Sequence, residues 1–189
     1  MLDALELLRT RRSVKIAALT EPAPSPAELE TLLTLAARVP DHGKLTPWRF
    51  IVFAGAAREA AGTIIASVFA AANPEADSAR LEIERTRLAR APLVVGVVSR
   101  ARPHVKIPEW EQVLSAAAAA MNLVNGAHAL GFAANWTTEW YAYDRAVLDR
   151  LGLESDERMV GFIHIGTPAQ PPEDRPRPPL AAVVTHFGG

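Results

Sequence analysis

The chain contains no cysteine, and this absence excludes several kinds of function. Disulfide frameworks, metal sites built from thiolates and catalysis by a thiol nucleophile all require that residue. Histidine is scarce too, and no two histidines have the spacing of a zinc-binding helix or finger. The five are His42, His104, His128, His164 and His186. We therefore expect no metal site.

The sequence also lacks an excess of charge of either sign. Its 20 Lys and Arg residues and 21 Asp and Glu residues leave a formal net charge of −1, and the two signs are interspersed along the chain. Nucleic-acid-binding proteins ordinarily show a basic face or stripe. No nucleic-acid partner is expected.

Long apolar runs are missing as well, because charge or glycine interrupts each run before it reaches the length of a membrane-spanning helix. The first residues, "MLDALELLRTRRS", place acidic residues before the basic cluster and lead to no small-residue cleavage site, unlike a signal peptide. We expect a cytoplasmic protein. With 189 residues, the chain is long enough for one domain, predicted over 1–189.

The helix signals are clearest in residues 25–38. Ser25 is a candidate N-cap, Pro26 occupies the first helical position and Glu28 completes a capping box, with leucines and alanines following on one face. Caps and periodicity predict further helices over 3–13, 56–72, 77–90, 109–130 and 144–152.

Two runs without polar alternation, 49–54 and 93–99, are typical of strands covered on both faces. Two further strands are expected over 132–136 and 158–166. Strands of this kind need helices on each side of the sheet, so the predicted fold class is α+β.

The end of the chain, residues 167–189, is predicted to be an extended C-terminal arm. Six prolines between 168 and 179 prevent helix formation there. The arm continues into an apolar stretch, "LAAVV", which needs a surface to pack on. A second subunit is a natural candidate.

Three polar clusters stand out. Arg11, Arg12, Ser13 and Lys15 combine cations with a hydroxyl, the mixture that holds a phosphate, although cationic helix ends are also commonplace. Arg175 and Arg177 lie in the proline-stiffened arm, where most arginines are simply solvated.

The third cluster is a loop, residues 41–46, immediately before Pro47 and Trp48. Asp41 and His42 could form an acid–base pair, but no nucleophile motif accompanies them, and a loop histidine more often caps a backbone group. A hydrolase is therefore the weakest interpretation.

Five stretches, in this order and spacing, resemble the FMN-dependent nitroreductase family, specifically its short single-domain members. They are "ALELLRTRRSVK", "PDHGKLTPWRFIVF", "VKIPEWEQVLSAAAAAMNLVNGAHALGFAANWTT", "VGFIHIGTP" and "RPRPPLAAVV". The resemblance implies a three-layer α/β/α sandwich with a central mixed, mainly antiparallel sheet. It also implies a homodimer that holds FMN at the subunit interface.

The resemblance assigns cofactor-binding roles residue by residue. Arg11, Arg12 and Ser13 match the N-terminal flavin motif, and Lys15 would face the N1–C2=O edge of the ring. Arg175 and Arg177 match a basic pair that reaches the phosphate. The remaining matches are the segment beside the ring, Trp136, Thr137 and Thr138, and two residues that would contact the flavin of the partner subunit, His42 and Thr46.

The implied function is an oxidoreductase that takes hydride from NAD(P)H and reduces nitroaromatic, quinone or similar electron-poor acceptors by a ping-pong mechanism. The flavin carries the hydride, so no catalytic side chain is required. The alternative is a flavin-binding or flavin-storage protein with little turnover, because Gly43, Lys44, Leu45 and Thr46 replace the Ser, Asn and Gln common in that loop. The physiological acceptor and the choice between NADH and NADPH stay open.

Four tryptophans and one helical histidine have competing interpretations. We expect Trp48 and Trp110 to be core or interface anchors. Trp136 and Trp140 fit core or pocket wall equally well. His128 is expected to be a satisfied packing residue.

Overall fold

The computed structural model describes residues 3–188 and centres on a five-stranded sheet. Its strands are β1 (Leu19–Thr20), β2 (Trp48–Ala54), β3 (Leu93–Ser99), β4 (Ala133–Thr137) and β5 (Arg158–Pro168). The order is β1-β5-β3-β2, and β4 also pairs with β5. Every ladder is antiparallel, while Ser13 and Ala134 form an isolated parallel bridge, so the predicted mainly antiparallel sheet is confirmed.

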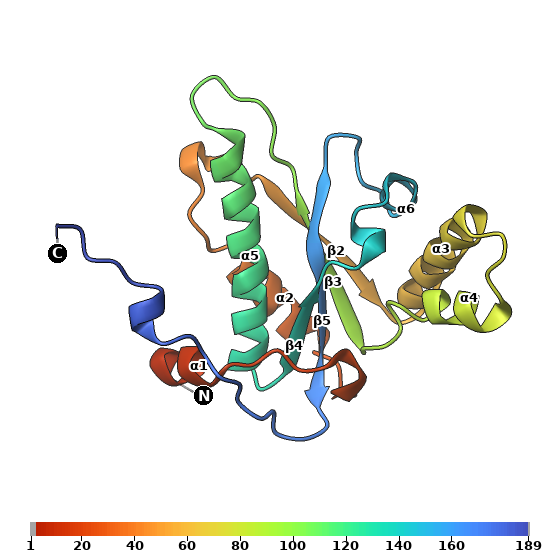
Figure 1. Cartoon of the computed structure of the whole chain (residues 1–189), viewed down its shortest axis with the longest axis horizontal. Helices are drawn as coiled ribbons and strands as arrows, with labels where there is room; N and C mark the ends of the chain where they lie inside the picture. The colour runs from red at the N-terminus through yellow and green to blue at the C-terminus, as the bar shows by residue number, and fades with distance from the viewer. Residues whose placement is uncertain (1–2, 189) are drawn as a thin grey trace.

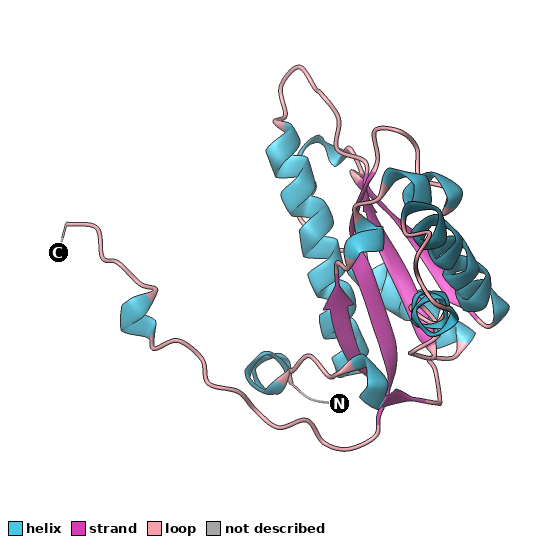
Figure 2. Cartoon of the chain, turned by 45° about the vertical axis from the view of Figure 1, so that its right-hand side comes forward, coloured by secondary structure: helices cyan, strands magenta, loops and turns pink. Residues whose placement is uncertain are grey.

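Helices cover the sheet on both sides (Figures 1 and 2). One side holds α2 (Pro26–Ala36) and α5 (Glu109–Ala129), and the other holds α3 (Ala56–Ala72), α4 (Ser78–Arg85) and α6 (Arg145–Arg150). All seven residues of β3 are buried, as its uninterrupted apolar sequence predicts for a strand between two helical layers. The core is accordingly split into two large apolar clusters, one on each face.

The predicted helix starts agree well with the structure, because their caps are local. Ser25 and Glu28 form the full capping box at the start of α2. Asp3, Asp77 and Asp144 likewise accept hydrogen bonds from backbone N–H groups in the first turns of their helices.

Two predicted helix ends are wrong. The first helix, α1 (Ala4–Thr10), stops before Arg11, because Val14 N–H donates to the Ala134 carbonyl and draws the chain to the sheet edge. The helix predicted to reach residue 90 ends at Arg85, and the chain turns there. The side chains of Arg87 and Arg90 then pair with Glu139, a residue remote in sequence.

The C-terminal arm leaves the body after β5 and runs outward (Figure 2). Its residues 169–188 are exposed. A single 3₁₀ turn, Leu180–Ala182, interrupts its extended path. Leu180, Val183, Val184 and Phe187 are all exposed. This apolar end is uncovered within one chain.

Other apolar side chains are exposed around α5. Trp48 is buried, as predicted, but Trp110 on α5 is 67% exposed and is not a core residue of the single chain. Leu114, one turn later, is 49% exposed, and Leu5 and Leu8 of α1 are also exposed. These residues belong to α5 and α1, two helices that lie next to each other (Figure 1).

His164 is a buried, uncharged residue in the middle of β5. Its side chain is fully buried, and within residues 3–188 neither ring nitrogen has a hydrogen-bond partner. Burial, with a smaller effect from the Arg90 charge, lowers the pKa of His164 to about 3. The folded chain therefore holds this ring neutral.

Substituting His164 is expected to make the protein less sensitive to acid. In the wild type the unfolded chain binds a proton at His164 below pH 6.5 while the folded chain does not, so stability falls as pH falls from 6.5 towards 3. At pH 5 this one group lowers the free energy of unfolding by about 2 kcal/mol. Urea unfolding should show that, between pH 7 and pH 5, His164→Leu loses about 2 kcal/mol less of its unfolding free energy than the wild type does. The exposed His186→Leu should keep the wild-type slope, and equal slopes in all three proteins would contradict the assignment.

Candidate functional site

Basic side chains from the two ends of the chain meet beside α1. Arg12 Nη1 donates to the Glu173 carbonyl at 2.6 Å and to Asp174 Oδ1 at 2.8 Å. Arg177 Nη2 lies 3.8 Å from the same Asp174 oxygen. The N-terminal cluster and the start of the C-terminal arm therefore occupy one place, although they are far apart in sequence.

The pKa of Arg11 reflects the positive charges that surround it. Burial lowers the pKa of Arg11, and the charges of Arg177, Arg12 and Arg175 lower it further. Asp174 is the acidic residue paired with this group, through Arg12 and Arg177. Of the four guanidinium groups only those of Arg12 and Arg177 face this carboxylate, so the cluster keeps an excess of positive charge, which suits an anion with two negative charges.

The chain from Ser13 to Lys15 runs alongside the start of β4. Ser13 forms the parallel bridge with Ala134, and Asn135 Nδ2 donates to the Val14 carbonyl at 2.6 Å. Ser13 and Lys15 are both exposed. The predicted N-terminal motif and the strand that leads to Trp136 thus form one continuous surface.

His128 fastens this motif to α5. Its Nε2 lies 2.8 Å from the Arg12 carbonyl and its Nδ1 lies 2.8 Å from the Val124 carbonyl. Burial lowers the pKa of His128, with the two backbone contacts opposing that shift. The predicted packing role is confirmed.

The predicted ring segment, Trp136 to Thr138, lies at the end of β4. Trp136 is half-buried, and its Nε1–H donates to the Val160 carbonyl at 3.2 Å. Thr137 Oγ1 donates to the Phe162 carbonyl at 3.5 Å, and Thr138 is exposed. Trp136 and Trp140, for which the sequence favoured neither core nor pocket wall, are both half-buried. Each indole N–H donates inside the protein, and that of Trp140 donates to Glu84 at 2.9 Å.

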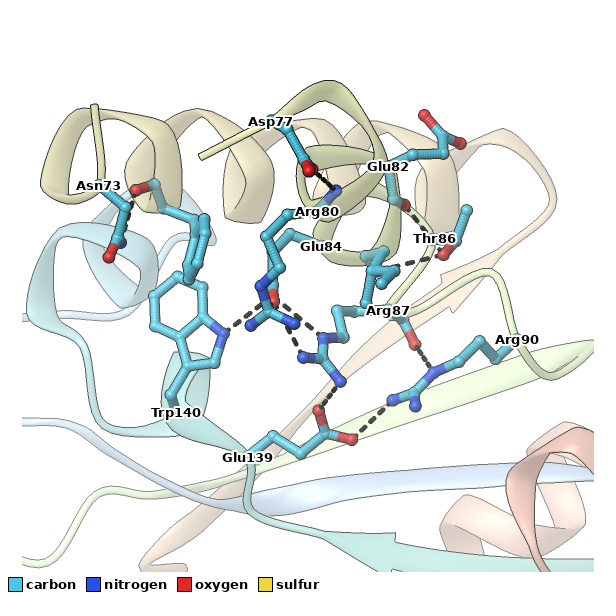
Figure 3. Close-up of polar contacts among 12 residues, drawn as sticks. Asn73, Asp77, Arg80, Glu82, Glu84, Thr86, Arg87, Arg90, Glu139 and Trp140 are labelled. Atoms are coloured by element: carbon cyan, nitrogen blue, oxygen red, sulfur yellow. Dashed lines mark hydrogen bonds and ion pairs between the residues drawn. The ribbon is translucent and has the colours of Figure 1, made fainter. Parts of the chain in front are cut away.

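A network of ion pairs and hydrogen bonds fixes the two residues after this segment, Glu139 and Trp140 (Figure 3). The sequence did not predict this network. Glu139 pairs with both Arg87 and Arg90. Glu84, which is fully buried, accepts from Arg87, Arg80 and the Trp140 indole. The i,i+3 spacing of Glu84 and Arg87 is visible in the sequence, but their partners Glu139 and Trp140, which are remote in sequence, are not.

The charge of Glu84 is stabilised despite its burial. Burial alone would raise the pKa of this carboxyl group, but hydrogen bonds from Arg87 and Trp140 and the charges of Arg87 and Arg80 outweigh it. The net effect is a lowered pKa, so the network is ionic at neutral pH.

The loop before Trp48 has an unusual backbone. Lys44 and Thr46 have φ values of 56° and 49°, in the left-handed region that a β-branched threonine rarely adopts. The Asp41 carboxylate accepts hydrogen bonds from the backbone N–H groups of Leu45 and Thr46, both at 2.9 Å, and holds this shape. Strain of this kind concentrates in segments that bind ligands.

The acid–base pair considered at Asp41 and His42 is not formed. Both Asp41 oxygens are occupied by backbone N–H groups, and His42 Nδ1 instead lies 2.7 Å from Glu111 Oε2 on α5. The interpretation of Asp41 and His42 as an acid–base pair is therefore wrong.

The two predicted parts of the site lie at opposite ends of α5. His42 contacts Glu111 near its start, and Arg12 contacts His128 near its end. At 1.5 Å per residue these two points are about 26 Å apart along the helix. Within one chain, the structure brings together Arg11, Arg12, Ser13, Arg175 and Arg177, but it does not bring His42 and Thr46 to them.

The sequence model of the nitroreductase family matches residues 8–167, which include the N-terminal arginines, the loop before Trp48 and the end of β4. The chain belongs to the nitroreductase family. Nitroreductase-family relatives match over most of its length. The protein "Putative NAD(P)H nitroreductase YdjA" of Escherichia coli (strain K12) is 35% identical over 167 residues, which cover 88% of this chain and 89% of the relative. A Haemophilus influenzae relative named "Putative NAD(P)H nitroreductase" is 36% identical with the same coverage.

Solved nitroreductase structures confirm the predicted α+β fold. A nitroreductase-like family protein from Bacillus cereus superposes with a TM-score of 0.84 at 23% identity, covering 100% of this chain and 98% of the other. The FMN and NADPH-dependent nitroreductase NfnB from Sphigopyxis sp. strain HMH gives 0.72 at 21% identity, with 100% of each chain covered. At these identities the likeness establishes the fold.

Residues 3–188 contain neither a candidate membrane-spanning helix nor a candidate metal site. No helix there is both long enough and apolar enough to span a bilayer. The same residues contain no group of three His, Cys, Asp or Glu side chains arranged to hold a metal ion.

Proposed function

We propose that this chain is an FMN-dependent oxidoreductase that takes hydride from NAD(P)H and reduces nitroaromatic, quinone or similar electron-poor acceptors in alternating half-reactions. The observation that carries the proposal is the meeting of Arg11, Arg12, Arg175 and Arg177 from the two ends of the chain. The names of the relatives support the donor, and the name of one structural neighbour supports both FMN and NADPH.

The donor groups present fit FMN. Guanidinium groups bind phosphate oxygens in pairs, and Ser13 adds an exposed hydroxyl to the four arginines. In this proposal Lys15 and the segment from Trp136 to Thr138 take the ring, since they extend the same surface along β4. When bound, FMN supplies the hydride chemistry, and the chain's residues bind and orient it.

The proposal includes a homodimer with FMN at the interface. The loop that carries His42 and Thr46 is about 26 Å along α5 from the arginines, farther than one FMN molecule extends. A second copy whose α5 runs in the opposite direction would bring its loop beside the first copy's arginines. The exposed apolar side chains on α5, α1 and the C-terminal arm support such an interface.

The purified protein tests this function directly. We expect a yellow preparation with flavin absorbance, bleached by NADPH or NADH under anaerobic conditions and restored by a nitroaromatic or quinone. Yellow protein that neither donor bleaches would favour flavin storage. Colourless protein that neither takes up FMN nor oxidises NAD(P)H would refute both.

Removing one arginine of the convergent group should weaken FMN binding. A charge-assisted hydrogen bond contributes about 1.5–3 kcal/mol, so Arg11→Ala or Arg177→Ala is expected to raise the FMN dissociation constant by about one to two decades. Quenching of flavin fluorescence on titration with apoprotein measures that constant.

Arg9→Ala is the matched control for this substitution. Arg9 is 74% exposed in its side chain, and among residues 3–188 it pairs only with Glu6 in the same helix, so its loss removes the same charge from the same neighbourhood. The FMN dissociation constant of Arg9→Ala should equal that of the wild type. Unchanged affinity in both Arg11→Ala and Arg177→Ala would rule out the phosphate assignment.

A further inference from the structure

The segment between β3 and α5 forms a second basic site beside the strained loop. A pocket of about 240 Å³ opens there, between that segment and the loop that ends at Thr46. Its lining includes Arg100, Arg102, His104 and Gln112. None of these residues belongs to the arginine group at the other end of α5.

The two arginines retain unsatisfied positive charge. Arg100 lies 3.4 Å from Glu157, but Arg49 already holds that carboxylate through two hydrogen bonds, at 2.6 and 2.7 Å. Arg102 faces Asp156 at 3.5 Å, and both side chains are more than half exposed, so that pair is weak. The pocket therefore favours an anion.

Hydrogen bonds of Gln112 and His104 fix the backbone that lines the pocket. Gln112, which is 3% exposed, donates to the Arg102 carbonyl at 2.8 Å and accepts from the Arg102 N–H at 3.1 Å. His104 Nδ1 accepts the backbone N–H groups of Lys106 and Ile107, at 3.2 and 3.1 Å. Since Nδ1 is an acceptor, the neutral ring carries its hydrogen on Nε2 and offers a further donor.

We propose that this pocket binds a phosphate group of the pyridine dinucleotide that donates the hydride. The inference rests on the proposed function, which brings the Thr46 loop against the flavin of the partner subunit. A nicotinamide stacked on that flavin has its phosphates one ribose away. The pocket on the other side of Thr46 is where such a group would lie, and it presents two guanidinium groups and an imidazole N–H.

Three hydride donors separate phosphate recognition from hydride transfer. Arg102→Ala in the holoenzyme is expected to raise KM for NADPH about tenfold, with kcat little changed, because a charged contact made equally before and during the reaction is lost. N-benzyl-1,4-dihydronicotinamide carries no phosphate, and its kinetics should be unchanged. NADH lacks the 2′-phosphate, so an equal effect on NADH assigns the pocket to the pyrophosphate and a smaller one to the 2′-phosphate.

A binding measurement tests the pocket without turnover. Calorimetric titration of the oxidised holoenzyme with adenosine 2′,5′-bisphosphate, and separately with ADP, should show about tenfold weaker binding of at least one probe to Arg102→Ala. Arg102→Lys should recover part of it. Arg85→Ala removes an arginine of similar exposure, 49% against 56%, from the opposite layer and should bind as the wild type does.

The outcomes distinguish this inference from the proposed function. Wild-type protein that is reduced by N-benzyl-1,4-dihydronicotinamide while Arg102→Ala leaves both KM for NADPH and probe binding unchanged would overturn the pocket and leave the oxidoreductase standing. An equal loss with the phosphate-free donor, or a change in KM for the acceptor alone, would also overturn it. Probe binding that depends on Arg102 in a protein that oxidises no NAD(P)H would keep the pocket as a phosphate site, but would reject both the proposed activity and the pocket's role for a hydride donor.

Discussion

Replacing Glu84 by alanine is expected to lower the free energy of unfolding by about 3 kcal/mol, the lower end of the range for removing one partner of a buried ion pair. Glu84 is fully buried and accepts hydrogen bonds or ion pairs from Arg80, Arg87 and the Trp140 indole (Figure 3). Arg87 keeps Glu139 after the substitution and Arg80 is partly exposed, so the loss stays at the lower end of that range.

Urea unfolding followed by tryptophan fluorescence measures the loss. Glu82→Ala is the matched control, because Glu82 lies on the same helix and pairs with Arg85 at the surface, with a side chain 62% exposed. Its effect should stay within about 0.5 kcal/mol of the wild type. Equal effects of the two substitutions would mean that the network contributes no more than a surface pair.

Placing a glutamate at Leu114 is expected to separate the proposed dimer and, with it, to release FMN. In a symmetric interface the substitution occurs twice. Losing the burial of two leucines, at about 1.5–3 kcal/mol each, weakens association by about two to four decades before any cost of burying the charges. In the single chain Leu114 is 49% exposed, so the fold itself should tolerate the change.

Sedimentation velocity together with the ratio of flavin to protein checks this expectation. Ile83→Glu is the control, because Ile83 is 50% exposed on α4 in the opposite layer. It should leave both the assembly and the flavin content unchanged. A Leu114→Glu protein that is still dimeric and fully yellow would place the interface elsewhere, and a monomer that retains FMN would reject the cross-subunit role of His42 and Thr46.

Local chemistry accounts for the parts of the fold that could be predicted. The start of α2 depends on Ser25 and Glu28, three residues apart, and both hydrogen bonds form as expected. The buried strand β3 is recognisable because all its residues are apolar or small and none alternates with charge. Such features need only neighbours in sequence, so reading the chain is enough to find them.

Predictions failed where a distant residue competes with local preference. Arg11 to Lys15 leave the helical path because Ala134 and Asn135 offer hydrogen bonds to the chain there. The helix that was expected to reach residue 90 ends at Arg85, where the arginines that follow turn towards Glu139. For Trp110, expected to be a core or interface anchor, the core alternative is wrong because the side chain is exposed in the single chain, and the interface alternative stays a prediction.

The amino-acid order alone was sufficient to indicate the family, to place most of the helices and strands, and to select the arginines at both ends of the chain as candidate phosphate ligands. Those inferences use motifs and periodicity, which are properties of neighbouring residues. The tertiary structure alone decided that the two ends meet at Asp174, that His42 faces Glu111 rather than Asp41, and that the loop and the arginines lie at opposite ends of α5. Contacts of this kind join residues far apart in sequence, and chain folding, which no local pattern encodes, brings them together.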